Sequence, residues 1–443
     1  MISRTSHTVL SLGLFFSLCA TLIKGDYPYA VLLATVVCLG LIAIVRLPLV
    51  LRSPIKLPVI RAIKKSPSIE FVCLKFLANS WWLILISWFF GVSNALLSGV
   101  DASLALRNFF GMIVYCIFPI LFFISISTTQ IIRIVVFAGL VQGIYLISLL
   151  IDSANIFLSG IDFKSLSDLR VAYNTGTTIL FPLLAISAAS VFYPRWGKRD
   201  GLPGWEYKFI SSRTSLGLLL AVIIIPSMSK GFILASFLIL IVVLIFALIE
   251  YRWSVRLIAY LIFFCTVIFG WIIIPQEWLD VVSFTFSSEE TSNYLRNEQA
   301  QYIMDEFTFF GAGLGSSLNS GYVRDDSGYG FELNYLNLIH KLGIFALPIF
   351  FSYIATVAVS LYRIRHRSNL LESYFAFGLM GFLIPGIGNP VLLSSTSVLL
   401  HSFAIYVLLS PSKLSRENTI HDSVTKQPPA KAGGFELRTE SPD

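Results

Sequence analysis

Long runs of apolar residues, separated by short polar intervals, make up most of this 443-residue chain. Many runs reach the roughly 20 residues that a helix needs to cross the hydrocarbon of a bilayer. Lipid satisfies no backbone hydrogen bond, so only helices and closed barrels span membranes, and runs this long exclude barrel strands. We therefore predict an all-α polytopic membrane protein, a bundle of about twelve transmembrane helices, near residues 8–23, 28–45, 76–97, 108–126, 131–151, 175–193, 214–228, 231–249, 257–274, 335–361, 372–388 and 393–409.

One polar interval is much longer than the others and extends over residues 275–333. We interpret it as an extracytoplasmic loop that folds over the mouth of the membrane domain. Its second half contains acids, bases, aromatics and a glycine cluster at Gly311, Gly313 and Gly315. The predicted organisation is a transmembrane domain at 1–409, which includes this loop, and a polar, cytoplasmic tail at 410–443 whose composition predicts disorder.

Composition and charge agree with a membrane protein. Charged residues make up 13% of the chain and the mean hydropathy is +0.79, whereas soluble domains carry about 25% charged residues. The net charge of +7 does not indicate nucleic acid, because the basic residues lie mostly in short loops between apolar runs. With the N-terminus in the cytoplasm, 24 of the 32 Arg and Lys residues fall on the cytoplasmic side, as the positive-inside rule requires.

The few basic residues predicted on the outer side are candidates for a binding site. Arg170, Lys230 and Arg296 come from different parts of the chain, and each is predicted near the outer membrane boundary. Cations there suit a lipid-linked phosphate or pyrophosphate, to which arginine donates paired hydrogen bonds. The alternative, which we favour for any one isolated residue, is anchoring to lipid headgroups. For Lys230, in a turn too tight to need a charge, we favour binding.

Glu332 stands at the start of a predicted span and allows two interpretations. It could complement the helix dipole, or accept a proton from a sugar hydroxyl. The glycine cluster is interpreted as a site of close backbone approach, with a phosphate cradle as the alternative. His340 and His401 lie within predicted spans and are interpreted as buried, hydrogen-bonded histidines. No metal-binding motif is found in the sequence, so we expect neither a metal nor a cofactor.

Several of these residues form a pattern that resembles the O-antigen polymerase and O-antigen ligase superfamily. The resemblance covers the architecture of most of the chain, and its motifs are short. They are Arg296, Gly311-x-Gly313-x-Gly315, Glu332-x-x-Tyr335-Leu336, Gly343-Ile344, Arg170 before Tyr173-Asn174, and Ser229-Lys230-Gly231, where the family more often has arginine.

The resemblance implies an inverting, metal-independent glycosyltransferase in the bacterial inner membrane. Its donor would be an undecaprenyl-pyrophosphate-linked oligosaccharide, used on the periplasmic side, and a chain-length regulator is a candidate partner protein. Glu332 and Arg296 would be catalytic. Candidate substrate-binding residues are Arg170, Lys230, Arg324, Tyr335, Gly311, Gly313 and Gly315.

The branch of the superfamily depends on one position. The ligase pattern carries histidine where Glu332 stands, so this chain resembles more closely the polymerase, which joins repeat units of O-antigen, capsule or exopolysaccharide. The usual polymerase motif, an arginine ten residues before a glycine, does not follow from Arg170 or Arg296. A ligase, a polysaccharide flippase or other transporter, and a non-catalytic assembly scaffold remain as alternatives.

Overall fold

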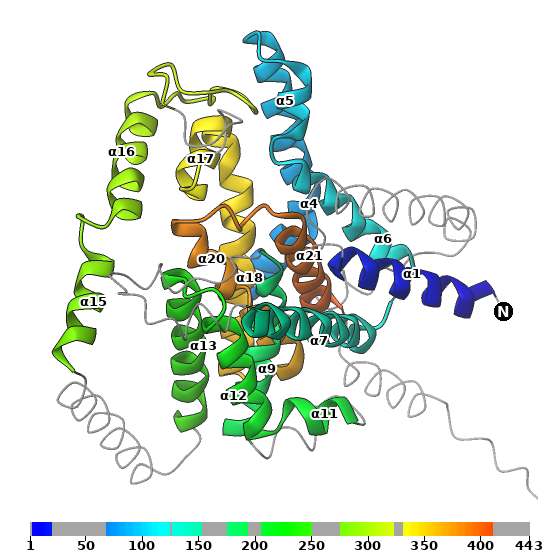
Figure 1. The fold of residues 1–443 in the computed structure, drawn as a ribbon. Helices are drawn as coiled ribbons and strands as arrows, with labels where there is room; N and C mark the ends of the chain where they lie inside the picture. Colours follow the sequence, from blue (N-terminus) through cyan, green and yellow to red (C-terminus); the bar gives the residue numbers. More distant parts are fainter. Residues whose placement is uncertain are drawn as a thin grey trace, which may run out of the picture.

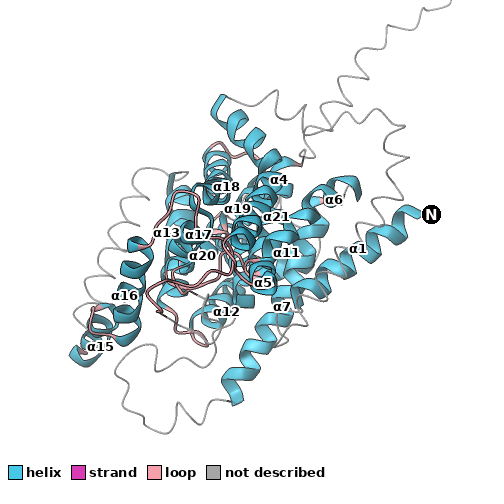
Figure 2. Cartoon of the chain, turned by 90° about the horizontal axis from the view of Figure 1, so that it is seen from above, coloured by secondary structure: helices cyan, strands magenta, loops and turns pink. Residues whose placement is uncertain are grey.

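The computed structural model describes residues 2–19, 68–124, 126–152, 175–193, 205–249, 275–322 and 331–410. Within these ranges the chain forms helices joined by loops, and no strand occurs (Figure 2). The helices carry the labels of Figure 1, and their bounds are α1 Ile2–Cys19, α4 Ser68–Leu97, α5 Ala102–Arg107, η2 Phe110–Cys116, α6 Ile117–Ile124, α7 Thr128–Asp152, η4 Thr175–Ile179, α9 Leu180–Phe192, α11 Trp205–Ile210, α12 Arg213–Ile224, α13 Lys230–Ile249, α15 Gln276–Phe286, α16 Thr291–Asp305, α17 Asn334–Leu342, η5 Gly343–Ala346, α18 Leu347–Arg365, α19 Leu370–Phe377, α20 Met380–Leu383, η6 Pro385–Ile387 and α21 Ser395–Leu409.

The described part of the chain is helical, and several of its helices have the length and apolar composition of membrane spans, as the apolar runs predict. Among the described residues, 5 helical segments are long and apolar enough to cross a bilayer, namely Glu70–Leu97, Thr128–Asp152, Lys230–Ile249, Asn334–Arg365 and Leu370–Ile387. Four shorter apolar helices are Phe110–Phe122, Gly176–Phe192, Arg213–Ile224 and Ser395–Leu409. A bundle of twelve spans is therefore not established. The predicted spans 28–45 and 257–274 and the predicted tail lie outside the described residues, and the predicted span 8–23 is described only to Cys19.

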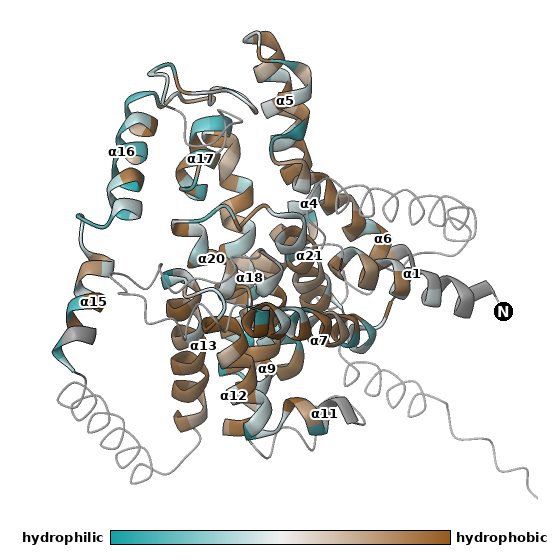
Figure 3. Ribbon diagram, viewed as in Figure 1, coloured by the Kyte–Doolittle hydropathy of each residue, from teal (hydrophilic) through white to brown (hydrophobic). Residues whose placement is uncertain are grey.

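Apolar helix faces pack into one continuous core. Helix α18 packs against α4 and α19, and α9 packs against α12, α13 and α19. Helix α21 is buried along its whole length. Hydrophobic residues dominate these helices, whereas polar residues gather on α16 and α17 and in the loop beside them (Figure 3). Among the described residues, polar side chains are thus concentrated at one end of the bundle.

A buried ion pair fastens the opposite end of the core. The Nε atom of Arg363, in the last turn of α18, donates to Oε1 of Glu70 in the first turn of α4 at 2.8 Å. Its Nη1 atom donates to the carbonyl oxygen of Leu408 in α21, also at 2.8 Å. One guanidinium therefore joins three core helices, with only 8% of the Arg363 side chain and 10% of the Glu70 side chain exposed.

The segment Asn334–Arg365 is not one straight helix, because it folds back at Gly343. In a straight helix, Tyr335 and Phe350 would be about 22 Å apart, but their ring centroids are 5.7 Å apart. Gly343 has a φ of 52°, and a β-carbon on it would collide with the carbonyl oxygen of Phe309. The short helix α17 therefore returns alongside α18 and brings its N-terminal end into the interior of the protein.

Candidate functional site

Arg296 and Glu332 form an ion pair where the long polar loop meets the membrane helices. Arg296 lies on α16, and Glu332 lies two residues before α17. The Nε atom of Arg296 donates to Oε2 of Glu332 at 3.0 Å. The side chains are 19% and 27% exposed, so the pair is partly open. Among the described residues Glu332 is the only partner of this guanidinium, which leaves its two Nη groups able to donate to an anion.

Lys230, the first residue of α13, is bound by the turn between α15 and α16. Its Nζ atom donates to Oε2 of Glu290 and to Oδ1 of Asn293, each at 3.1 Å, and to the carbonyl oxygen of Thr285. Glu290 also caps α16, because its Oε2 accepts the amide of Asn293 at 3.0 Å. The Glu290 side chain is 6% exposed. This lysine therefore fixes the start of α16 against the start of α13.

One face of α16 holds both cations, since it carries Arg296 itself and the partner of Lys230. Asn293, which binds Lys230, and Arg296 are three residues apart, and side chains at this spacing are neighbours on a helix. Gln299 continues this face, and its Oε1 atom accepts the amides of Glu332 at 3.0 Å and Leu333 at 3.2 Å. Polar side chains on this face therefore attach α16 to α13 and to the start of α17.

The chain around η6 lies beneath these polar groups. A β-carbon on Gly388 would be 3.4 Å from Nε of Arg296, and one on Gly231 would be 2.8 Å from Cα of Pro385. The Tyr335 hydroxyl donates to the carbonyl oxygen of Leu383 at 2.6 Å. Lys230, Arg296, Glu332 and Tyr335 thus gather around residues 383–388. We name these four residues the polar cluster.

Each cation of the polar cluster is paired with a carboxylate. Among the described residues, Lys230 pairs with Glu290 and Arg296 pairs with Glu332. A bound phosphate or pyrophosphate would add negative charge, and it would compete with the carboxylates for the same donors. The two side chains are similarly exposed, but Lys230 donates to three described partners and Arg296 to one, so an anion displaces the partner of Arg296 more easily.

The glycine cluster inserts into the fold-back at Gly343. The amides of Ala312 and Gly313 donate to the carbonyl oxygens of His340 at 2.7 Å and Lys341 at 3.0 Å, in the last turn of α17. The amide of Leu314 donates to the carbonyl oxygen of Gly91 in α4 at 3.0 Å. These amides are occupied within the protein, so they offer no cradle to a phosphate.

The three glycines have the geometry of close backbone approach. They have φ values of 80°, 91° and 76°, and β-carbons on Gly311, Gly313 and Gly315 would lie within 2.5 to 2.7 Å of Lys341, Ala95 and Leu104. This agrees with the interpretation of the cluster as a site of close backbone approach and not as a phosphate cradle. The three glycines therefore stay substrate-binding candidates only by resemblance, and their observed contacts are structural.

Of the remaining candidates, Arg170 and Arg324 lie outside the described residues. The prediction that His401 is buried and hydrogen-bonded is confirmed, since Nδ1 lies 2.6 Å from the Tyr115 hydroxyl and Nε2 lies 3.2 Å from Oγ1 of Thr356. His340 is buried, but its Nδ1 atom has no hydrogen-bond partner within the part of the chain that the structure describes.

Sequence reasoning missed the residues that position the cations, namely Glu290, Asn293 and Gln299. The only signal for Glu290 was its negative charge at the start of a polar helix, which the helix dipole favours, because glutamate is not among the preferred capping residues. The roles of Asn293 and Gln299 follow from a spacing of three residues relative to Arg296, which becomes informative only when the helix itself is predicted.

Comparisons with known proteins add no further constraint. No family model matches the chain, and no curated protein matches it. The polar cluster and the resemblance of its motifs are therefore the features that bear on function.

Proposed function

We propose that this protein is a polymerase that transfers one lipid-linked oligosaccharide repeat unit to another during synthesis of O-antigen, capsule or exopolysaccharide. The observation that carries the proposal is the partly open Arg296–Glu332 ion pair, which lies on the same face of α16 as the binding partner of Lys230. It brings a phosphate-binding cation and a proton acceptor within hydrogen-bonding distance of each other. Both groups belong to the motifs that resemble the superfamily.

In the proposed reaction the donor pyrophosphate binds the cations. The Nη groups of Arg296 donate to phosphate oxygens, and Lys230 supplies a second positive charge from the start of α13. As the bond between the anomeric carbon and the phosphate oxygen breaks, negative charge grows on the leaving pyrophosphate. Cations that are fixed beside this oxygen stabilise the transition state more than the ground state and so accelerate the reaction.

Glu332 completes the proposed reaction as the general base. When the phosphate takes over the donors of Arg296, the Glu332 carboxylate loses that hydrogen bond and accepts one from a hydroxyl of the acceptor sugar. That oxygen attacks the anomeric carbon from the face opposite the pyrophosphate, and its proton passes to Glu332, so the configuration inverts. Tyr335, whose hydroxyl is bonded to Leu383, would contribute its ring to the wall of the sugar site.

The proposal includes a place in the cell. The donor is undecaprenyl-pyrophosphate-linked, the protein lies in the bacterial inner membrane with about twelve crossings, and the polar cluster faces the periplasm. This orientation follows from the distribution of Arg and Lys. Topology reporters fused after Asn319 and Ser410 should report opposite sides, and a cytoplasmic signal from both would contradict the orientation.

Transport of a lipid-linked glycan is the second candidate. The observation that favours it is the fold-back at Gly343, because transporters build their binding sites from interrupted helices whose ends lie inside the membrane. A transporter needs the cations but does not need a general base. The two functions therefore differ in whether the purified protein in detergent, without a membrane to transport across, forms glycosidic bonds.

Reconstitution tests the proposal directly. Purified protein in detergent is mixed with lipid-linked repeat units, and the products are separated by size. A ladder of longer glycans supports a polymerase, and unchanged single units from active-site-intact, folded protein contradict it. Glu289→Gln is a matched control for Glu332→Gln, because Glu289 is an exposed carboxylate next to the Lys230 partner Glu290.

A deletion strain distinguishes the polymerase from a ligase. Gels of its surface glycan should show the ladder reduced to a single repeat unit. Complete loss of attached glycan would identify the ligase instead and contradict the polymerase.

A further inference from the structure

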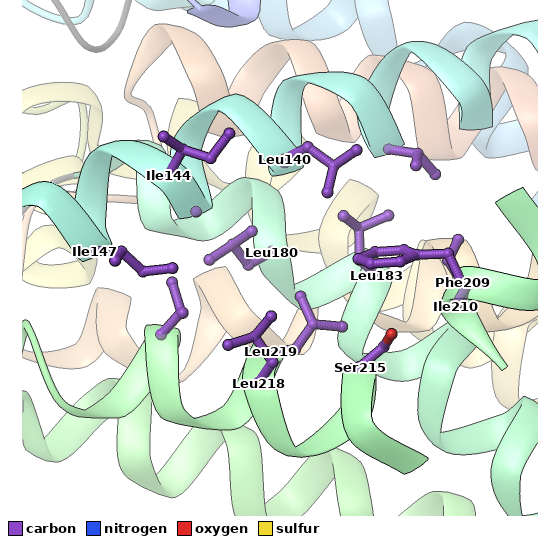
Figure 4. Close-up of a pocket in the computed structure, with 14 residues that line it drawn as sticks. Leu140, Ile144, Ile147, Leu180, Leu183, Phe209, Ile210, Ser215, Leu218 and Leu219 are labelled. Carbon is purple, nitrogen blue, oxygen red and sulfur yellow. The ribbon is translucent and has the colours of Figure 1, made fainter. Parts of the chain in front are cut away.

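An apolar pocket of about 100 Å³ lies between α7, α9, α11 and α12, separate from the polar cluster. Leu140 and Ile144 of α7, Leu183 of α9, Phe209 of α11 and Leu219 of α12 point into it (Figure 4). Among its 14 lining residues only Ser215 has a polar side chain, and its hydroxyl accepts a hydrogen bond from Ser212 at 2.8 Å. The pocket therefore offers hydrocarbon contacts and no free polar group.

The pocket is open on the outside of the bundle. Ile144 is 68% exposed and Leu218 is 48% exposed, although both line the pocket. A side chain added at Gly143, another lining residue, would meet nothing within 4 Å. Since α7 has the length and hydropathy of a membrane span, the medium beside this opening is lipid. An acyl chain would cover apolar surface that the protein itself leaves open.

Two exposed basic residues adjoin, in sequence, the lining residues at one end of the pocket. Lys208 directly precedes the lining residue Phe209, and Arg213 begins α12, two residues before Ser215. Both belong to the basic interval that the charge distribution places at the cytoplasmic surface. An apolar groove that opens to lipid and has basic residues beside its cytoplasmic end matches a molecule with an apolar chain and an anionic head. Basic pockets between membrane helices on the cytoplasmic side bind anionic lipid headgroups.

We propose that this pocket binds an anionic glycerophospholipid of the surrounding bilayer. One acyl chain fills the space between α7, α9 and α12, and the phosphate lies against Lys208 and Arg213. The bound lipid joins α7 to α12 across a gap that side chains do not fill. This site is independent of the glycan chemistry proposed above, so either proposal can fail without the other.

A variant that fills the pocket tests whether an acyl chain binds there. The variant Gly143→Phe places a ring in the open space, and Gly217→Phe is the matched control, because Gly217 is also a helical glycine with nothing within 4 Å of an added side chain but does not line the pocket. Delipidated protein is titrated with dioleoyl phosphatidylglycerol, and bound lipid is counted by native mass spectrometry. We expect the control to retain one tightly bound lipid and Gly143→Phe to lose it. Equal retention by both variants would overturn the proposal.

Headgroup preference tests the charged part. Unsubstituted protein should retain phosphatidylglycerol in preference to phosphatidylcholine with the same chains. The double variant Lys208→Gln/Arg213→Gln should weaken phosphatidylglycerol binding by roughly 30-fold, since each basic residue near an anionic lipid surface contributes about fivefold. Lys75→Gln, an exposed lysine on α4, is the control and should change nothing. Equal binding of the two phospholipids, or retention of undecaprenyl phosphate but of neither phospholipid, would overturn the proposal.

Discussion

Two ion pairs with the same chemistry occupy opposite ends of the bundle. Arg363 and Glu70 are almost fully buried. Arg363 also donates to Leu408, so this residue of α18 joins its own helix to two others. Arg296 and Glu332 are partly exposed and share one hydrogen bond, and Glu332 is the only partner of Arg296 among the described residues. The buried pair has the geometry of a structural contact that holds helices together. The second has the geometry of a contact that a ligand can open.

The difference shows how surroundings decide what an ion pair does. A buried pair is costly to separate, because each charge would remain without water or a partner. A partly exposed pair gains little net stability, since solvent screens it and competes for its donors. Loss of Arg363 should therefore be detected as loss of folding, and loss of Arg296 or Glu332 as loss of activity. The predictions below test this separation.

The largest effect is expected for Glu332→Gln. Glutamine can still accept a hydrogen bond from Arg296 but cannot take up the acceptor proton, so the polymerisation rate should fall by roughly 10²–10⁴-fold. Complementing the dipole of α17 alone would involve only about 0.3–1 kcal/mol. The measurement is the initial rate with lipid-linked repeat units, and the thermal unfolding of the variant should match that of Glu289→Gln. Near-normal turnover would remove Glu332 from the mechanism.

The next effect concerns stability. Arg363→Ala leaves Glu70 as a buried charge without its partner, which should destabilise the fold by about 3–5 kcal/mol. Thermal unfolding in detergent measures the loss, and Arg296→Ala serves as the comparison. A double variant, Glu70→Gln/Arg363→Met, should recover much of the stability, because it removes both charges. If Arg296→Ala unfolds as easily as Arg363→Ala, the distinction between the two pairs is wrong.

A smaller effect is expected when Arg296 becomes lysine. The charge stays, but lysine cannot donate two parallel hydrogen bonds to a phosphate. Losing one charge-assisted hydrogen bond of about 1.5 kcal/mol corresponds to roughly a tenfold lower rate. Arg296→Ala should stop polymer formation while the protein still inserts in the membrane. Normal glycan length with the alanine variant would show that Arg296 only anchors the loop to the membrane surface.

The smallest effect is a pH dependence in the loop after α16. The Glu306 carboxylate accepts the amides of Asn319 at 2.7 Å and Ser320 at 2.9 Å. Burial acts to raise the pKa of Glu306, but these hydrogen bonds outweigh it and lower the pKa below its ordinary value. A lowered pKa in the folded state means that the stabilisation is complete above the ordinary pKa of about 4.3 and is lost as the pH falls through the lowered value.

Hydrogen exchange measures this effect. At neutral pH the amides of Asn319 and Ser320 should exchange about twofold faster in Glu306→Gln than in the unsubstituted protein, a modest factor because solvent screens the exposed carboxylate. As the pH falls through the lowered pKa of Glu306, the ratio should approach one. A ratio that does not change with pH would contradict the role of the Glu306 charge.

Much of the membrane fold could be predicted from the apolar runs. The predicted spans at 76–97, 131–151 and 231–249 correspond to α4, α7 and α13, because lipid leaves a long apolar segment no alternative to a helix. The predicted span at 335–361 lies within the apolar helical segment Asn334–Arg365, but the turn at Gly343 inside it was not predicted. Hydropathy registers the apolar residues on both sides of Gly343, but the fold-back depends on a loop that begins more than thirty residues earlier in the chain.

The candidate site was predicted in its residue types and not in its contacts. The positive-inside rule made Lys230 and Arg296 conspicuous, and the structure places both beside α16. The pairing of Arg296 with Glu332 could not be foreseen, because it depends on how Gln299 attaches α16 to the residues before α17. Ion pairs between distant segments require the docking geometry, which periodicity does not contain.

The fold-back at Gly343 has a consequence for the order of assembly in the membrane. The carbonyl oxygens of His340 and Lys341 receive the amides of Ala312 and Gly313 from a different part of the chain. Without that loop, the segment Asn334–Arg365 would have to find other donors for these oxygens, and a continuous helix would supply them. The return of α17 and the docking of the loop are therefore one cooperative step. The polar cluster, which includes Tyr335 of α17, exists only after this step, so insertion of the apolar helices precedes completion of the site.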